Sequence, residues 1–292
     1  MSRAESQGLA AIPLILVIGG AIAWAGSQGG RELMGIPLFA LCASLAFLIN
    51  WIAFVPAYLR QTERYFDLTG SLTYLCLVLV ALALDGEPDA RALLLGALVA
   101  TWAVRLGGFL FARIVREGAD RRFDALRPSP PRFLMAWTLQ GLWVLVTLSC
   151  ALAAMTSARP KPVGALGALG VVVWVLGFAI EVAADRQKRR FRADPANRER
   201  FIRSGLWAWS RHPNYFGEIM LWCGIALIAL PVLAGWQHAT LVSPVFVYLL
   251  LTRVSGIPLL EARADEKWGD TPEYRHYRDH TPVLFLRPPQ SV

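Results

Sequence analysis

Long apolar stretches alternate with short polar connections along the whole of this chain. Eight stretches approach the roughly 20 residues that a helix needs to cross a bilayer, and these are 9–26, 36–59, 69–84, 91–114, 133–156, 163–184, 214–234 and 238–257. Because only helices and closed barrels satisfy their backbone inside lipid, such runs predict an all-α polytopic membrane bundle of seven to eight transmembrane helices. The first stretch is short and rich in Gly and Ala, and it can also be interpreted as a signal-peptide core without a clear cleavage site.

Composition and charge support a membrane protein and orient it. Of the 292 residues, 55% are hydrophobic and 17% are charged, a balance that excludes an ordinary soluble domain. Arginine and lysine gather in the loops 115–132 and 185–213, whereas the loop 85–90 is acidic. By the positive-inside rule, we expect the basic loops and both termini in the cytoplasm. The bias toward Arg, Ala, Leu and Gly indicates a bacterial source and hence the inner membrane.

The same charge pattern limits the classes of partner. A net charge of +8 on one side of the membrane predicts contact with anionic membrane lipids or a phosphate-bearing ligand. We expect no nucleic acid, because the basic residues adjoin membrane spans. The four cysteines lie inside apolar stretches without metal-binding spacing and the four histidines are scattered, so we expect packing roles for the cysteines and no metal site.

One stretch, Ser204–Trp222, concentrates chemically different side chains where a basic loop meets an apolar helix. Pro213 suits the first turn of a helix. Asn214 and Glu218 then lie four residues apart on one face of that helix. Polar and ionisable groups at the end of a membrane span are costly and usually functional. The spacing therefore predicts a ligand site at this helix start.

Polar residues also interrupt the spans of the N-terminal half. Asn50 and Pro56 are expected to pack or kink their helix. Asp67 and Thr69 precede an apolar run, so either can cap the helix 69–84, and Asp67 can instead face an active site at the membrane boundary.

Two arginines lie in the fourth span at different depths. Arg113 can extend toward the cytoplasmic face. Arg105 lies about two helical turns deeper, so we expect it to need a partner or a cavity. A buried ion pair that only holds the bundle together is the alternative.

The sixth span continues into a charged helical stretch. Asp185 is spaced to form helix ion pairs with Lys188 and Arg189. The alternative is a polar face that binds a dinucleotide, with a carboxylate on a ribose hydroxyl and guanidinium groups on phosphates. The charged, Tyr-rich tail after Arg253 is expected to fold as a cytoplasmic cap.

Four ordered motifs carry a family resemblance. They are Phe191–Pro195, Gly205–Glu218, Glu261–Glu266 and Tyr274–Pro282. Their pattern resembles the C-terminal domain of the steroid 5-alpha-reductases and of the membrane sterol C14 and delta-7 reductases, in their bacterial branch. The resemblance extends over about residues 50–287. It implies NADPH-dependent reduction of a carbon–carbon double bond in a lipophilic, steroid-like or isoprenoid enone.

The resemblance also implies a cytoplasmic cofactor pocket that the C-terminal tail closes. Within it, the residues 185–192 would contact ribose and phosphate, the motif around His212 would hold the nicotinamide, and the tail would close the adenosine end. The residues implied to bind NADPH are Asp185, Arg189, Arg192, Trp207, Arg211, His212, Asn214, Tyr215, Glu218, Arg253, Glu261, Tyr274, Tyr277 and Arg278.

Catalysis needs a donor for the carbonyl oxygen of the enone, where negative charge develops. The family uses a tyrosine and a glutamate, and by the resemblance Asp67 would stand for the glutamate. The tyrosine position falls on Trp102, whose indole donates a hydrogen bond but no proton. Tyr74, Tyr65 or Arg105 can take the donor's place. The departure at Trp102 puts a steroid enone as substrate in question.

These expectations divide the chain into an additional N-terminal span (1–30), a substrate-side half (31–160) and an NADPH-binding half (161–292). A second class of enzyme shares the motif around His212, namely membrane methyltransferases of the isoprenylcysteine and phospholipid type that use S-adenosylmethionine. The second basic cluster, at 186–192, suits the extra phosphates of NADPH and favours the reductase. A lipid-binding membrane protein without catalysis is the third possibility.

Overall fold

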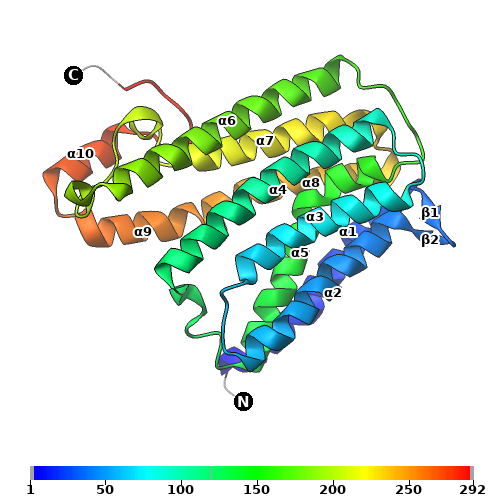
Figure 1. Ribbon diagram of the computed structural model, residues 1–292, viewed down its shortest axis with the longest axis horizontal. Coiled ribbons are helices and arrows are strands. Elements are labelled where there is room, and N and C mark those ends of the chain that lie inside the picture. Colours follow the sequence, from blue (N-terminus) through cyan, green and yellow to red (C-terminus); the bar gives the residue numbers. More distant parts are fainter. Residues whose placement is uncertain (1–2, 119, 290–292) are drawn as a thin grey trace. The chain divides into compact units, whose positions relative to one another are not determined.

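The computed structural model describes residues 3–118 and 120–289, and it is built mainly of helices (Figure 1). A short antiparallel hairpin follows the first helix. Its strands, β1 (Glu32–Leu33) and β2 (Ile36–Pro37), have two residues each. The helices are α1 (Arg3–Ser27), α2 (Leu38–Leu59), α3 (Phe66–Leu84), α4 (Ala90–Glu117), α5 (Pro130–Met155), α6 (Ala165–Ala193), α7 (Pro213–Ala229), α8 (Val242–Leu249), α9 (Ile257–Trp268) and α10 (Pro272–His280).

Within the described residues, eight helical spans are long and apolar enough to cross a membrane. They coincide with the eight apolar stretches of the sequence, so the predicted all-α membrane bundle is confirmed and the chain is a multi-pass membrane protein. The last span is the least regular, because a short π-helix (Leu250–Val254) separates α8 from α9. The sixth span reaches Ala193 instead of residue 184, since its charged end keeps helical spacing after the apolar residues stop.

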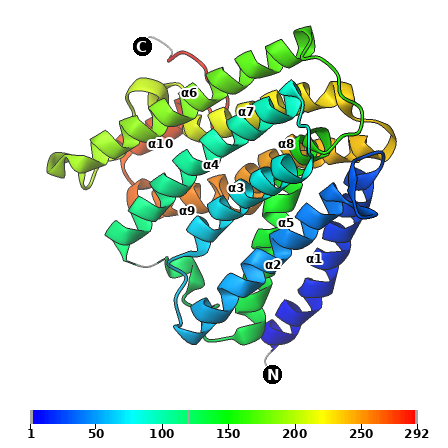
Figure 2. The ribbon, with the colours of Figure 1, turned by 45° about the vertical axis from the view of Figure 1, so that its right-hand side comes forward.

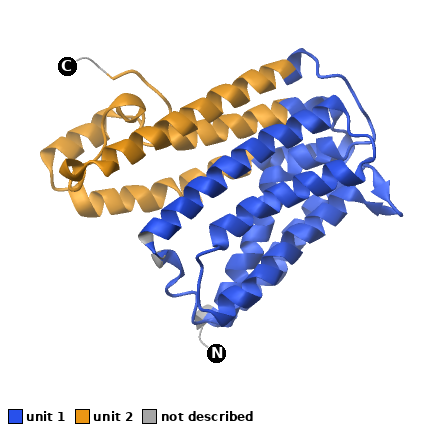
Figure 3. Cartoon of the chain, in the orientation of Figure 1, with its two compact units in different colours: residues 1–167, 228–243 blue, residues 168–227, 244–292 orange. Residues whose placement is uncertain are grey.

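The chain divides into two compact units (Figure 3). Unit 1 comprises residues 1–167 and 228–243, and unit 2 comprises residues 168–227 and 244–292. The chain therefore returns to unit 1 after the first part of unit 2. The functional division at 160/161 that the sequence suggested stays a prediction.

Helix α5 forms the centre of unit 1. In its most apolar 18-residue window, 89% of the residues are buried, against 22–39% for α1, α2, α3 and α4. These four helices all contact α5, and Figures 1 and 2 show α5 running behind α2 and α3. Pro130 at the first turn and apolar residues on every face explain a helix that starts sharply and buries most of its surface.

A buried polar contact joins three helices of unit 1. The Nε2 of Gln140 on α5 donates to Oδ1 of Asn50 on α2 at 3.0 Å and to the carbonyl of Phe66 on α3 at 2.8 Å. Asn50 in turn donates to the carbonyl of Ala46 within its own helix. Because these polar groups satisfy one another away from water, they fix how the helices align. The packing role predicted for Asn50 is confirmed.

The predicted cap of the third span is wrong. Helix α3 begins at Phe66 rather than at residue 69, so Thr69 lies inside it and donates to the carbonyl of Tyr65 at 2.8 Å. The ring of Phe66 packs on Phe123 and Trp137, with centroid distances of 4.7 and 5.1 Å. This packing extends the helix toward its N-terminus and places Asp67 in the first turn.

Close backbone approach organises the start of unit 2. Figures 1 and 2 both show α6 and α7 side by side. A Cβ on Gly217 would lie 2.5 Å from the carbonyl oxygen of Gly177, and one on Gly224 would lie 2.6 Å from that of Gly170. Only glycine permits such contact, as in small-residue helix pairs of membrane proteins.

A compact aromatic layer completes unit 2. Trp207 is buried with Ala184 and Ile202, and its Nε1 donates to the carbonyl of Ala184 at 3.0 Å. Tyr274 on α10 is buried and packs edge-on against Phe201 at a centroid distance of 5.2 Å. The tail is therefore a folded part of unit 2.

Candidate functional site

The motif around His212 begins α7 as the sequence predicted, with Pro213 as the first helical residue. The C-terminal segment 282–287 holds the residues that precede it. Ser210 accepts from the backbone N–H of His212 at 3.1 Å and donates to the carbonyl of Leu284 at 2.9 Å. The backbone N–H of Arg211 donates to the carbonyl of Pro282 at 2.9 Å. Backbone pairing thus fixes the position of this loop.

Glu261 on α9 joins the motif to the tail. Its carboxylate accepts from the guanidinium of Arg211 at 2.5 Å and from Nε2 of His212 at 2.7 Å. The ring of His212 stacks on that of Tyr215, with centroids 5.7 Å apart and planes 8° from parallel. These contacts leave the imidazole one orientation.

The electrostatics make His212 a neutral hydrogen-bond acceptor. Its residue is only 4% exposed, and burial lowers its pKa more than the Glu261 carboxylate raises it. A neutral ring that donates from Nε2 to Glu261 carries a lone pair on Nδ1. The contact with Glu261 is therefore a hydrogen bond between a carboxylate and a neutral ring.

Two buried acceptors at this site have no protein partner. Within residues 3–118 and 120–289, neither Nδ1 of His212 nor Oδ1 of Asn214 finds a hydrogen-bond partner. Buried polar atoms are almost always paired, and an orphan in a folded protein calls for a ligand or water. Two acceptors two residues apart suit an amide NH₂ group. Glu218 lies on the same helix, four residues after Asn214.

The basic end of α6 supplies unpaired cations. Arg189 and Arg192 are exposed, and in the part of the chain that the structure describes no carboxylate lies within ion-pairing distance of either. The helix ion pair considered for Arg189 is therefore wrong. The ammonium of Lys188 lies 4.4 Å from the ring centroid of Trp207. Asp185 lies one turn before Arg189 and is half-buried.

Four other candidates of unit 2 have structural partners. The hydroxyl of Tyr277 donates to the carbonyl of Trp207 at 2.7 Å, and burial raises its pKa, so it stays protonated. Trp207 and Tyr274 pack in the aromatic layer, and Arg278 pairs with Asp265 at 3.1 Å. Arg253 in the π-helix is exposed.

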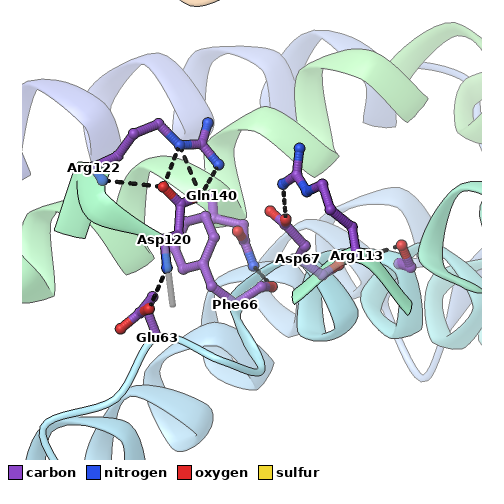
Figure 4. A network of polar contacts seen from close by, with 8 residues as sticks. Glu63, Phe66, Asp67, Arg113, Asp120, Arg122 and Gln140 are labelled. Carbon is purple, nitrogen blue, oxygen red and sulfur yellow. Dashed lines mark hydrogen bonds and ion pairs between the residues drawn. The ribbon is translucent and has the colours of Figure 1, made fainter. Parts of the chain in front are cut away.

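In unit 1, Asp67 forms an ion pair with Arg113 at 3.2 Å (Figure 4). Arg113 thus pairs with a carboxylate, where the sequence suggested only an extension toward the membrane surface. Asp120 lies nearby in the same figure, and its carboxylate accepts hydrogen bonds from the guanidinium Nε and Nη2 and from the backbone N–H of Arg122. Burial raises the pKa of Asp120. The hydrogen bonds and the charge of Arg122 lower this pKa by more than burial raises it, so the net shift is downward.

The remaining candidates of unit 1 lie deeper along α3 and α4. Tyr74 and Trp102 are buried and meet edge to face at a centroid distance of 5.1 Å. The guanidinium of Arg105 lies 5.6 Å from the ring centroid of Phe109. Gln140 and Arg113 were not among the residues predicted to form the site, although each is a polar residue inside an apolar span and Arg113 was noted for its position in the fourth span.

No group of three or more His, Cys, Asp or Glu side chains among the described residues can hold a metal ion. The four cysteines are free; Cys42 and Cys150 are buried as expected of packing residues, whereas Cys223 is exposed.

Comparison with known proteins then decides the family. A family model described as "Protein of unknown function (DUF1295)" matches residues 53–281. The chain belongs to this family. Its similarity to steroid 4-dehydrogenases and to a sterol reductase supports the steroid 5-alpha-reductase superfamily, as the motifs implied.

Three relatives illustrate the similarity. The 3-oxo-5-alpha-steroid 4-dehydrogenase 1 of Bos taurus is 29% identical over 111 residues, 36% of this chain and 38% of its own length. The Delta(14)-sterol reductase of Ascobolus immersus is 35% identical over 97 residues, 28% of this chain and 22% of its own. An uncharacterised protein of Schizosaccharomyces pombe is 25% identical over 232 residues, which cover 68% of this chain and 64% of its own length. No solved structure matches the chain.

Proposed function

We propose that this protein is an integral membrane reductase that uses NADPH to reduce a carbon–carbon double bond in a lipophilic enone of steroid-like or isoprenoid type. Relatives named as a steroid 4-dehydrogenase and a sterol reductase support an oxidoreductase of this kind, although the chain spans less than two-fifths of either. Eight apolar spans suit a substrate that dissolves in the membrane. The bias toward Arg, Ala, Leu and Gly favours a bacterial inner membrane, and the basic loops favour a cytoplasmic position for the cofactor residues.

One observation carries the proposal. Two buried acceptors, Nδ1 of His212 and Oδ1 of Asn214, have no hydrogen-bond partner among the described residues. The carboxamide of a nicotinamide ring presents an NH₂ group, which two such acceptors can receive. Glu261 holds the His212 ring in the orientation for this role, and burial keeps the ring neutral. When bound, NADPH supplies the hydride.

The polar residues around these acceptors fit the rest of a dinucleotide. Arg189, Arg192 and Arg253 are exposed cations that can neutralise its phosphates. Asp185 can accept from a ribose hydroxyl. Glu218 extends the polar face of α7 beyond Asn214. Trp207, Tyr274 and Tyr277 support this arrangement through the aromatic layer.

Reduction of an enone also needs a donor for the carbonyl oxygen. Tyr74 and Arg105 carry hydrogens that can stabilise an enolate, and Asp67 can do so only when its carboxyl group is protonated, whereas Trp102 can only donate a hydrogen bond. Asp67 is the strongest candidate for acid–base work, because its ion pair with Arg113 fixes a carboxylate that remains 24% exposed. Tyr74 is the strongest candidate for direct donation.

Ligand binding tests the proposal. The detergent-purified protein is titrated calorimetrically with NADPH and, in parallel, with S-adenosylmethionine. The variants are Asn214→Leu, Glu218→Ala and, as a matched control on the exposed face of α9, Glu266→Ala. We expect NADPH to bind to the wild type and the control, and to bind at least tenfold more weakly to both motif variants. Binding of S-adenosylmethionine alone would overturn the proposal in favour of a methyltransferase.

A further inference from the structure

A hollow of about 360 Å³ opens in unit 1 beside the β1–β2 hairpin, which Figure 1 labels. Its walls come from three consecutive segments, the end of α1, the hairpin and the start of α2. The lining residues are Ala23, Trp24, Ser27, Gln28, Gly29, Glu32, Pro37 and Ala40. None of them belongs to the residues proposed above for the cofactor or for catalysis.

The hairpin turns its one polar side chain toward this hollow. In its ladder, Glu32 pairs with Pro37 and Leu33 pairs with Ile36. Paired residues of an antiparallel ladder project from the same face, and successive residues project from opposite faces. Glu32 and Pro37 line the hollow, whereas Leu33 and Ile36 do not. The carboxylate of Glu32 therefore lies on the face of the hairpin that borders the hollow.

The surroundings of the hollow are those of a membrane surface. Leu33 and Ile36 on the other face of the hairpin are exposed, and Met34 at its tip is 97% exposed. Trp24, which lines the hollow, lies against Trp236 at a ring centroid distance of 5.6 Å, and both side chains are exposed. Tryptophans at the end of a span are typical of the lipid headgroup level. The hollow is therefore positioned to meet lipid headgroups.

The negative charge of Glu32 has no counterpart in the protein. Among the lining residues, all of which the structure describes, Glu32 alone is charged. No ion pair or hydrogen bond engages its carboxylate within residues 3–118 and 120–289. The preceding Arg31 is used elsewhere, because its Nε pairs with Asp85 at 2.9 Å and its Nη1 donates to the carbonyl of that residue at 2.9 Å. An external cation can therefore pair with Glu32.

The end of α1 favours the same kind of ligand. The hydroxyl of Ser27 donates to the carbonyl of Ala23 at 2.6 Å, and Nε2 of Gln28 donates to the carbonyl of Trp24 at 3.1 Å. The donors of both side chains are thus used within the helix, and their oxygens can still accept. The last turn of α1 contains no basic residue to offset the negative end of the helix dipole. Together with the indole face of Trp24, these groups favour an ammonium ion.

Arg159 supplies a positive charge at the same hollow. A bridge between Gly30 and Ser157 holds its segment against the chain that follows α1. Its Nη2 lies 4.0 Å from the position that a Cβ on Gly29 would take, and Gly29 lines the hollow. In the described part of the chain, no carboxylate or other acceptor engages this exposed guanidinium. A carboxylate and a guanidinium at one hollow match a ligand that carries both an ammonium and a phosphate group.

We propose that this hollow binds the headgroup of phosphatidylethanolamine, with the ammonium group at Glu32 and Trp24 and the phosphate at Arg159. The volume lies at the low end of ligand pockets, about 300–1,000 Å³, which suits a headgroup whose acyl chains stay in the bilayer. Soluble phosphoethanolamine carries the same two charges. The exposed apolar hairpin favours the lipid as the source, and the experiment separates the two. The site does not depend on the proposed reductase reaction.

The test titrates short-chain lipids calorimetrically into the full chain in detergent. Dihexanoyl phosphatidylethanolamine is compared with dihexanoyl phosphatidylglycerol, which lacks the ammonium group, and with O-phosphoethanolamine, which lacks the acyl chains. The variants are Glu32→Gln and, as a matched control, Glu87→Gln, which removes an exposed carboxylate outside the hollow. We expect the wild type and the control to prefer phosphatidylethanolamine over phosphatidylglycerol about tenfold, and Glu32→Gln to lose this preference.

A second variant tests the aromatic wall. Trp24→Leu keeps an apolar surface but removes the indole face, so phosphatidylethanolamine should bind about three- to fivefold more weakly. Because Glu32 and Trp24 are exposed, both variants should keep the Tm of the wild type.

Two results would overturn the inference. An unchanged preference in Glu32→Gln, or no preference in the wild type, would remove the ammonium site. Binding of O-phosphoethanolamine as tightly as the lipid would show that the acyl chains contribute nothing, and the lipid source would be wrong. Neither result bears on the reductase proposal, because NADPH binding is measured separately.

Discussion

Replacing Glu261 by glutamine tests the centre of the candidate site with the smallest change of shape. The carboxylate accepts from both Arg211 and His212, so it serves two donors from one loop. Glutamine keeps one oxygen and places an NH₂ group where the second oxygen was. That group faces a donor, and one of the two contacts is lost.

The size of the effect follows from burial. A hydrogen bond to a charged group contributes about 1.5–3 kcal/mol, and breaking a fully buried ion pair costs about 3–5 kcal/mol. The side chains of Arg211 and Glu261 remain 11% and 23% exposed, so water screens part of this. We expect a loss of about 2–3 kcal/mol in the free energy of unfolding. That corresponds to a fall in Tm of about 5–10 °C.

Binding should suffer as well as stability. Without Glu261, the Nε2–H of His212 has no fixed acceptor, so the ring can turn or exchange its tautomer. Nδ1 then no longer presents a fixed lone pair, and we expect NADPH to bind about tenfold more weakly, or about 1.4 kcal/mol.

The assay compares Glu261→Gln with Glu266→Gln, which removes the same charge from an exposed position of the same helix. Thermal unfolding of the detergent-purified protein and calorimetric NADPH titration are measured for both. The reasoning is refuted if the two variants have the same Tm and the same Kd for NADPH.

Three further outcomes are expected. Gly217→Ala places a Cβ 2.5 Å from a carbonyl oxygen of α6 and should lower Tm by the equivalent of about 1–3 kcal/mol, whereas Gly108→Ala, with no atom within 4 Å, should not. The lowered pKa of His212 means that the unfolded chain binds a proton first as the pH falls. The contribution of His212 to the free energy of unfolding is therefore complete above about pH 6.5 and declines below that pH toward the pKa of the folded state. Measuring Tm as a function of pH checks this. Asp67→Asn removes a partly exposed ion pair worth about 1 kcal/mol or less, so Tm should barely move, yet enone-dependent NADPH consumption should fall about 10²–10⁴-fold. Asp124→Asn, which loses an exposed partner of similar kind, should keep full activity, and equal loss in both would remove Asp67 from catalysis.

Hydropathy alone predicted the eight spans, because lipid forces every span to be helical and apolar over a fixed length. It failed at helix ends, where apolar content no longer decides. Helix α6 continues to Ala193 through charged residues, and α3 begins at Phe66 because an aromatic side chain packs there. Such ends depend on tertiary contacts that a local window does not contain.

The site shows a similar division. The spacing of Pro213, Asn214 and Glu218 predicted a helix start with a polar face, and α7 begins as expected. The sequence did not reveal that the segment 282–287 holds this loop, because backbone hydrogen bonds carry no side-chain signature. Nor did it reveal that Arg113 would pair with Asp67, 46 residues away.

The structure also separates two kinds of residue that the motif treats alike. The polar atoms of Trp207 and Tyr277 are used within unit 2, one on the carbonyl of Ala184 and the other on the carbonyl of Trp207. The acceptors of His212 and Asn214 are not used. A residue of the first kind acts on a ligand only through the fold that it stabilises. A buried acceptor of the second kind costs the folded chain stability unless water or a ligand satisfies it, and that cost is the physical reason to propose that His212 and Asn214 bind the ligand.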